Sequence, residues 1–348
     1  NAELPTIEAD SGSAVDMARL AGTAKVIIST VGPYAQHGTK LLEACAAEGT
    51  HYCDLTGEPQ WMAAVFEKVS DMAEESGARL VHCCGFDSIP SDLGVFVAQK
   101  IMRERHGVYA THVSGRMGPS KGAVSGGTVA SMLLAMEQGV SDPIARKALN
   151  HHYALYPAEL DPGVDGADQK GVKWDDNFDS WTGPFVMAAV NSKVVRRSNA
   201  LASLIYGADF AYDEAMLTTN RRSALLLAGG MGAGMLAFAI GPLRRMIAKK
   251  LPQPGEGPSP SERENGFFEF FVHAKHPDST QKDVRVAVKG KRDPGYGATS
   301  RMIAQAGLCL AFDDLDVEGG IWTPATALGV HLVDRLATVD VVFDEQAL

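Results

Sequence analysis

The amino-acid sequence predicts an α/β protein in which a doubly wound parallel sheet precedes a second domain with a mixed, mainly antiparallel sheet. Its 348 residues correspond to about two domains of ordinary size. The first hundred residues alternate strand and helix patterns, whereas longer strands with alternating polarity follow after about residue 105. The composition, 45% hydrophobic and 21% charged, excludes a disordered chain, a collagen-like repeat and a multi-span transporter.

The first domain is predicted over residues 1–100. Residues 25–31 form a continuous run rich in β-branched side chains, as expected for a strand buried on both faces. Strands and helices that alternate at this spacing require parallel pairing through right-handed crossovers, so we expect a Rossmann-like sheet. The predicted strands are 4–8, 25–31, 51–55 and 79–84, and the predicted helices are 13–20, 39–48 and 60–76.

The phosphate-binding loop Gly-x-Gly-x-x-Gly, which normally follows the first strand of such a sheet, is absent from the sequence. The chain begins at Asn1, in what we interpret as the third strand of the sheet. We therefore expect that an N-terminal βαβ unit is missing from this sequence. A chain that is complete as given would lack the pyrophosphate cradle of a dinucleotide site.

The second domain is predicted over residues 101–322. Alternation is clearest at Val284, Val286 and Val288, which face away from Arg285 and Lys289. Residues 251–265 are rich in proline, glycine and serine and predict a flexible loop. The remaining predicted elements are strands at 109–117, 184–195, 209–217, 266–276 and 282–289, and helices at 128–138 and 299–312. Residues 323–348 are expected to return to the first domain through a helix at 323–337.

Charge and cysteine content narrow the function classes. The net charge of −10 argues against a general nucleic-acid binder. The five cysteines show no disulfide framework and no zinc-ligand spacing, and His37, His82 and the pair at 151–152 lack metal-ligand partners, so no metal site is expected. Without a charged-then-apolar leader, the sequence predicts a cytoplasmic protein.

Polar or glycine-containing segments follow three consecutive predicted strands, at 29–34, 54–58 and 85–92. In a doubly wound sheet such strand ends open onto one ligand-binding crevice. We expect the cofactor to contact Thr30, Val31, Gly32, Pro33, Gly85 and Phe86, with Asp10 near the adenine ring. The alternative is that these segments only start helices, because Ser88 and Ser91 are ordinary capping residues and Pro90 suits a first turn.

The motifs Val31-Gly-Pro-Tyr34, Tyr52-x-Asp54-Leu-Thr-Gly-Glu58 and Cys84-Gly-Phe-Asp-Ser-Ile-Pro-Ser-Asp-Leu93 resemble the saccharopine dehydrogenase-like oxidoreductases. Further matches are similar to the trans-acting enoyl reductase subfamily of mycobacterial lipid synthesis: Val124-Ser-Gly-Gly-Thr-Val-Ala130, Trp181-Thr-Gly-Pro-Phe185, Arg196-Arg-Ser-Asn-Ala-Leu201 and Trp322-Thr-Pro-Ala-Thr326. The resemblance covers nearly the whole chain and implies NADPH-dependent reduction of a carbon–carbon double bond in a polyketide-type acyl chain. The sequence does not decide between NADPH and NADH.

Enoyl reduction needs hydrogen-bond donors for the thioester oxygen and a proton for the α-carbon. Tyr34 and Asp87 are the candidate catalytic groups, although Tyr34 could equally pack on the cofactor edge and Asp87 could cap a helix. Backbone amides at the helix start after Ser125, Gly126 and Gly127 suit an oxyanion or a phosphate, or form only a glycine-rich helix start. Ser88 is expected to contact the substrate.

Two other functions stay open. An imine or amino-acid reductase of the saccharopine type would need arginines for the substrate carboxylates, and none of the three strand-end segments contains one. A non-catalytic lipid-surface scaffold that kept the fold is the alternative outside enzymes. The expected partners are an acyl-chain substrate carried by a polyketide synthase and a second copy of the chain in a homodimer.

Residues 223–243 contain no charged side chain and lie between Arg222 and Arg244. The segment is long enough for one bilayer core but contains five glycines and Pro242, which weaken a helix. The surrounding window, 193–250, has nine basic residues and three acidic ones, a net charge of +6. We expect a buried interdomain or dimer helix, or a membrane surface contact through 221–250 at the inner face of the plasma membrane. A full span is the least favoured.

Overall fold

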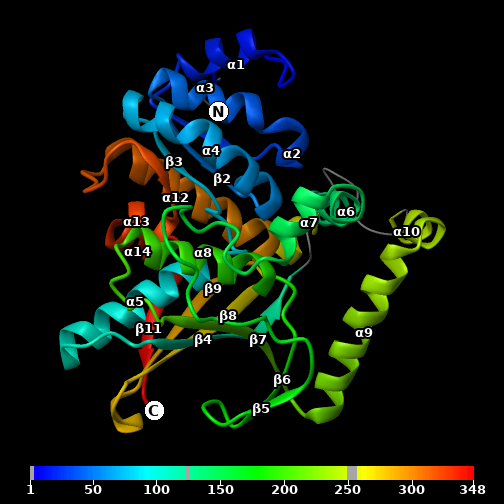
Figure 1. Ribbon diagram of the computed structural model, residues 1–348, viewed down its shortest axis with the longest axis vertical. Helices are drawn as coiled ribbons and strands as arrows, with labels where there is room; N and C mark the ends of the chain where they lie inside the picture. Colours follow the sequence, from blue (N-terminus) through cyan, green and yellow to red (C-terminus); the bar gives the residue numbers. More distant parts are fainter. Residues whose placement is uncertain (1–3, 123–125, 249–256) are drawn as a thin grey trace.

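The computed structural model describes residues 4–122, 126–248 and 257–348, which form two sheets joined by one layer of helices (Figure 1). The first sheet is parallel, with the strand order β1-β2-β3-β10. The second has seven strands in the order β11-β9-β8-β4-β7-β6-β5, and only the pair β4 and β7 is parallel. The predicted fold class is confirmed.

The first sheet and its helices occupy the upper part of Figure 1. The strands are β1 (Val26–Ser29), β2 (His51–Asp54), β3 (Arg79–Val81) and β10 (Gly320–Trp322). The helices are α1 (Ala14–Ala21), α2 (Tyr34–His37), α3 (Thr39–Glu48), α4 (Pro59–Ser76) and α12 (Thr299–Phe312).

Neighbouring residues of the short strands enter different cores, which shows that helices cover both faces of the first sheet. Tyr52 and Leu80 are buried among residues of α3 and α4. Cys53 and Val81 are buried in the other core, which contains residues of α12. Because strand side chains alternate between the two faces, α12 lies on the face opposite α3 and α4. This is the doubly wound arrangement that the sequence predicts.

The second sheet lies below the first in Figure 1. Its strands are β4 (His112–Lys121), β5 (Lys173–Asp175), β6 (Ser180–Gly183), β7 (Ala211–Thr218), β8 (Phe267–Lys275), β9 (Val284–Lys291) and β11 (Val341–Gln346). The remaining helices are α5 (Ile89–His106), α6 (Gly126–Ser141), α7 (Pro143–Asn150), α8 (Ala188–Leu201), α9 (Arg221–Ala239), α10 (Gly241–Ala248), α11 (Pro260–Glu264), α13 (Pro324–Ala327) and α14 (Gly329–Ala337). A 3-10 turn spans Thr280–Lys282 and a π-helical turn spans Pro294–Ala298.

Two helices connect the sheets. α5 begins a few residues after β3 and packs against β8 and β9. One continuous core therefore extends from Cys53 in the first sheet to Val272 and Val286 in the second. α8 contributes Val195 to this core and Val194 to the core under α3 and α4. Both sheets are therefore held by the same two helices. The predicted boundary at residue 100 falls inside α5.

Two predicted strands are wrong. Residues 4–10 form no strand in the structure, so Asp10 follows an irregular segment. The predicted strand at 184–195 is largely the helix α8, and its apolar run is followed by buried polar residues that pair with other elements. A short apolar run is compatible with a strand or with a buried helix, and in this protein the contacts with other elements stabilise the helix.

The C-terminal region differs from the prediction in detail. Residues 320–322 form β10 beside β3, and the predicted helix at 323–337 is divided into α13 and α14 at Gly329, which has a φ of 38°. α13 and α14 contact α5, whereas β11 pairs with β9 in the second sheet. A three-residue strand such as β10 gives almost no sequence signal.

The uncharged segment 223–243 is helical, as predicted, but α9 ends at Ala239 and α10 follows. α9 extends along the right side of Figure 1. In the described part of the chain, no helix is both long and apolar enough to cross a bilayer.

We expect Gly290→Ala to destabilise the second sheet. A Cβ atom at Gly290 in β9 would lie 2.1 Å from the ring of Phe268, which is buried in β8. Overpacking of this kind costs about 1–3 kcal/mol or more, because the ring has to move. The measurement is the urea midpoint, with Gly166→Ala as the control since a Cβ there meets nothing within 4 Å. Equal midpoints for the two variants would contradict the packing described here.

Candidate functional site

The carboxyl ends of β1, β2 and β3 lie next to one another. Ser29 at the end of β1 pairs with Asp54 at the end of β2. The backbone amide of Cys84, just after β3, donates to the carbonyl of Asp54 at 2.7 Å. A Cβ at Gly85 would lie 2.8 Å from Leu55, so these two segments are in direct contact. The structure therefore brings the three predicted strand-end segments together.

Tyr34 is the last residue of the first of these segments and is 4% exposed. Its hydroxyl donates to the carbonyl of Ser29 at 2.9 Å and accepts from the amide of Leu55 at 3.1 Å. The ring stacks on Trp61 with centroids 5.4 Å apart. Burial, and then the nearby Asp54, hold the pKa of the phenol well above its usual range. The geometry gives Tyr34 a structural task, and its catalytic role stays a prediction.

Glu58 fixes the turn that contains Tyr34. The side chain is fully buried, and its carboxylate accepts from the amide of Tyr34 at 2.8 Å and from that of Ala35 at 2.9 Å. The hydroxyl of Ser131, in α6, donates to the same carboxylate at 2.7 Å. Glu58 thus caps α2 and holds α6 against the strand ends. The sequence alone does not reveal this role, because the partners of Glu58 are 23 to 73 residues away in the chain.

Asp54 organises the ends of β2 and β3. Its carboxylate accepts from the amides of Thr56 and Cys83, each at 3.1 Å. The hydroxyl of Tyr52 donates to it at 3.1 Å, and Nδ1 of His82 lies 2.7 Å away. Four neighbouring groups thus contact a carboxylate that is 0% exposed. Asp54 is therefore a structural residue of the site.

A small cavity lies beside His82, between α4, α8 and the end of β10. Two buried nitrogens belonging to lining residues, Nε2 of His82 and Nε of Arg197, have no hydrogen-bond partner in the described structure. Arg197 donates instead to the carbonyls of Leu155 at 2.7 Å and Ile321 at 3.0 Å. Burial lowers the pKa of Arg197 to about 10. This arginine ties α8 to the end of β10.

Asp87 has a different environment. It is half-buried in the segment after β3, and within the described ranges its carboxylate has no hydrogen bond or ion pair. Burial raises the pKa of Asp87 to about 6. The neighbouring Phe86 is fixed by its amide, which donates to Thr299 at 3.1 Å, and by its ring, which lies 4.7 Å from that of Phe268. Among the described residues this carboxyl group is thus unpaired, and the residue before it is held by two contacts.

Ser88 belongs to a buried polar chain rather than to an open surface. Its hydroxyl donates to the side-chain oxygen of Asn191 at 3.0 Å, and the side-chain NH2 group of Asn191 donates to Glu214 at 3.1 Å. Tyr212 donates to the same carboxylate at 2.7 Å. Burial raises the pKa of Glu214 to about 7. The Ser88 hydroxyl thus already has a partner inside the protein. Its predicted contact with the substrate stays a prediction.

The other predicted site residues are placed as follows. Gly126 is buried and Gly127 half-buried at the start of α6, five and four residues before Ser131, whereas Ser125 lies outside the described residues. Thr30 and Val31 are exposed at the end of β1, and Gly32 and Pro33 are half-buried. Asp10 is exposed and accepts from the amide of Gly12 at 2.8 Å, and its hydrogen bonds within the described residues are with Gly12 and Asp16, away from the strand ends.

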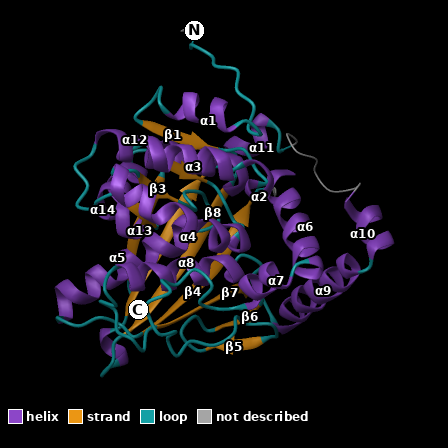
Figure 2. Cartoon of the chain, turned by 45° about the horizontal axis from the view of Figure 1, so that its top comes forward, coloured by secondary structure: helices purple, strands orange, loops and turns teal. Residues whose placement is uncertain are grey.

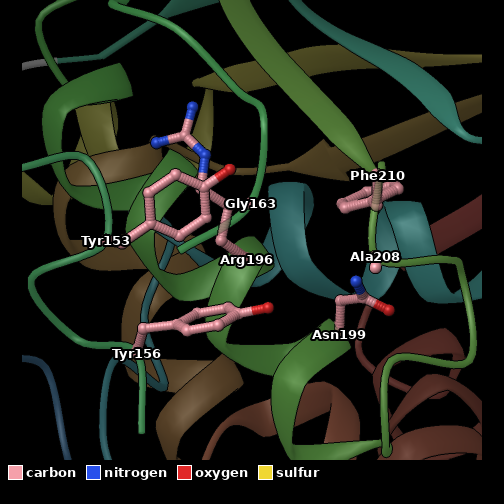
Figure 3. A pocket seen from close by; sticks show the side chains of 7 residues that line it. All are labelled: Tyr153, Tyr156, Gly163, Arg196, Asn199, Ala208 and Phe210. Atoms are coloured by element: carbon pink, nitrogen blue, oxygen red, sulfur yellow. The ribbon is translucent and has the colours of Figure 1, made fainter. Parts of the chain in front are cut away.

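A separate shallow hollow lies at the far end of α8 (Figure 3). Its lining consists of Tyr153, Tyr156, Gly163, Arg196, Asn199, Ala208 and Phe210. The Arg196 guanidinium is committed to Asp165 at 2.7 Å and to the carbonyl of Tyr212 at 3.1 Å. No predicted site residue lines this hollow, so we assign it no function. Nor do three His, Cys, Asp or Glu side chains gather as metal ligands anywhere in the described residues.

We expect Glu58→Gln to destabilise the site. In glutamine one of the two accepting oxygens becomes an NH2 group, which can only donate, so the backbone amide of either Tyr34 or Ala35 would lose its acceptor. The cost is about 2–3 kcal/mol of unfolding free energy. Urea unfolding of this variant should be compared with Glu67→Gln, an exposed residue of α4 that should change stability by less than about 0.5 kcal/mol. Equal losses in both variants would exclude a special role for Glu58.

Comparisons with known proteins identify the family. No family model matches the chain. Rv2449c of Mycobacterium tuberculosis, which carries the provisional name of a trans-acting enoyl reductase, is 37% identical over 352 residues, 97% of this chain and 84% of that protein. The trans-acting enoyl reductase of Mycobacterium bovis is 35% identical over 358 residues, 98% of this chain and 85% of that protein. Saccharopine dehydrogenase from Saccharomyces cerevisiae covers 98% of this chain and 89% of its own, with a TM-score of 0.47 and 12% identity. The sequence relatives place the chain in the family of mycobacterial trans-acting enoyl reductases.

Proposed function

We propose that the protein is an NADPH-dependent enoyl reductase that acts in trans on a polyketide- or fatty-acyl-type lipid intermediate. Its relatives are named as enoyl reductases, and the substrate, the cofactor and the residues that act are our proposal. The observation that carries it is Asp87, a free carboxyl group with a pKa of about 6 beside the joined ends of three parallel strands. A proton donor at this edge of the sheet is what the second half of an enoyl reduction requires.

The residues at the strand ends fit a nicotinamide group. Thr30 and Val31 are exposed, and Phe86 is half-buried, with its backbone amide bonded to Thr299 and its ring packed on Phe268. A Cβ at Gly32 would meet Tyr34 at 3.5 Å and Ser131 at 3.7 Å, so the backbone here lies close to α6 without being covered. Residues 30–33, Gly85 and Phe86 would hold the cofactor, which supplies a hydride to the β-carbon of the enoyl group. The given sequence contains no glycine-rich pyrophosphate loop.

Asp87 supplies the proton. Reduction leaves negative charge shared between the α-carbon and the thioester oxygen, and it is discharged when the O–H bond of the carboxyl breaks and a C–H bond forms at the α-carbon. The raised pKa of Asp87 allows a fraction of the protein to hold this proton near neutral pH. The resulting carboxylate takes a proton back from solvent, which its partial exposure permits.

Donors for the thioester oxygen would come from the start of α6. Ser131 holds this helix to Glu58, and the amides of Gly126 and Gly127 belong to its first turn. The first turn of a helix has amides without intrahelical partners, which suit a developing oxyanion. The carboxylate of Glu58 thus acts indirectly, because it sets the position of α6 relative to the strand ends.

An amino-acid substrate fits this site less well. Arg197 lies near the strand ends, but its outer nitrogens donate to two carbonyls and its plane lies 4.5 Å from the ring of Phe66. It is therefore not available to pair a substrate carboxylate. An acyl chain carried by a synthase, with this protein as a homodimer, remains our proposal for the partners.

Cofactor binding separates the reductase from a scaffold. We expect NADPH fluorescence to change saturably when the full-length protein is titrated, and NADPH to be oxidised only when an enoyl thioester is added. The same titration with NADH measures the preference between the two cofactors. Oxidation with an oxo acid and an amine, but not with the thioester, would favour the imine reductase. No saturable binding by full-length protein would favour the scaffold.

Asp87→Asn should lower kcat by about 10²–10⁴-fold and change KM little, because the substitution removes the proton donor but not the binding surface. In the wild type, kcat should fall as the pH rises above about 6, since only the protonated carboxyl can donate. The variant should lose this pH dependence. Asp71→Asn, on the exposed face of α4, is the control and should behave like the wild type. An unchanged pH profile in Asp87→Asn would rule out Asp87 as the acid.

A further inference from the structure

α9 and α10 form an arm, residues 221–248, that lies along the outside of the molecule (Figures 1 and 2). The inward face of α9 packs on β6 and β7: Ala224 is fully buried, and a Cβ at Gly183 would lie 2.9 Å from Leu227. α6 contacts α9 further along. The arm is therefore attached along one face only.

The outward face of α9 is apolar and uncovered. Its residues recur at spacings of four and three, which places them on one side of a helix. Leu226 and Leu236 on this face are 77% and 70% exposed, and Ile240, directly after the helix, is 52% exposed. Between them the helix carries small residues, and a Cβ at Gly229 or Gly230 would meet nothing within 4 Å. After Arg222 in the first turn, the residues on this side of α9 are Leu226, Gly229, Ala233 and Leu236, and Ile240 follows directly at the C-cap.

Basic residues stand at both ends of this apolar face. Residues 221–250 contain six basic side chains and no acidic one, while the rest of the chain has 26 basic and 42 acidic residues, a net charge of −16. Arg222 is exposed at the first turn of α9, and Arg244 in α10 lies 3.8 Å from Glu137. The exposed basic surface is smaller than the predicted basic window at 193–250, because Lys193, Arg196 and Arg197 are buried in α8.

We propose that the arm binds the surface of an anionic lipid bilayer. The outward face of α9 lies in the boundary between headgroups and acyl chains, and the arginines at its two ends contact lipid phosphates. Such a helix lies in the plane of the membrane and does not cross it, in accord with its length and composition. The proposal does not depend on the reductase activity.

Charge decides between a membrane and a second copy of the chain. Two arms packed face to face would bring arginines next to arginines in either relative direction, since basic residues stand at both ends of each arm. Like charges at such short distances oppose association. Phosphate headgroups would neutralise the same arginines while the acyl region covers Leu226, Leu236 and Ile240. A bilayer is thus the occupant whose charge and apolar character match the arm.

The test is flotation of the full chain with vesicles of phosphatidylcholine alone or mixed with phosphatidylglycerol, at low and high salt. We expect binding only to the mixed vesicles, weakened by salt. Each arginine near an anionic leaflet strengthens binding about fivefold, so removing four should reduce the partition coefficient by more than about a hundredfold. The arm variant changes Arg221, Arg222, Arg244 and Arg245 to Ser. The matched control changes four exposed lysines outside the arm to Ser: Lys68, Lys147, Lys170 and Lys282.

A second variant, Leu226→Ser with Leu236→Ser, tests the apolar contribution without changing charge. It should lose vesicle binding while its thermal unfolding stays close to that of the wild type, because both side chains are exposed. Three results would overturn the proposal: a wild type that stays unbound at low salt, equal loss of binding in the arm variant and the lysine control, or a dimer in solution that the leucine variant dissociates. The last result would assign the arm to a second copy.

Discussion

Two buried carboxylates, those of Asp54 and Glu58, hold the strand ends in place. Each accepts several hydrogen bonds from backbone amides that would otherwise be unpaired in the interior. A buried backbone amide without an acceptor destabilises the fold by about as much as the loss of a hydrogen bond. Few other conformations of these loops would give all of these amides an acceptor. The sheet alone would place the strand ends at one edge. The carboxylates fix the segments that follow, and with them the positions of Phe86 and α6.

The sequence predicts the first sheet well because its signals are local. The run at 25–31, the glycines that end α3 and α4, and the alternation in β9 each depend on residues close together in the chain. α8 was predicted as a strand because residues 184–195 start with an apolar run. Its helical state depends on partners such as Glu214 for Asn191 and Asp165 for Arg196, which are remote in sequence.

The candidate site follows the same division. That three strand-end segments meet is a property of topology and could be predicted. The tasks of individual residues could not, because they depend on where each side chain finds its partner. Tyr34 and Ser88 lie in strand-end segments where ligand-binding residues are expected, yet their hydroxyls donate hydrogen bonds to groups inside the protein. Glu58 is in one of the motifs but gives no sign that it holds Ser131.

The continuous core through α5 has a consequence for motion. Residues from the first sheet, α5, α12 and the second sheet are buried together, so a hinge between the two sheets would expose much of that apolar surface to water. Opening and closing of the two halves, which admits substrate in many two-domain enzymes, is therefore energetically costly in this fold. Substrate entry would have to depend on small local movements of single loops. Cleavage of the chain within α5 would leave two fragments that each lack a complete core.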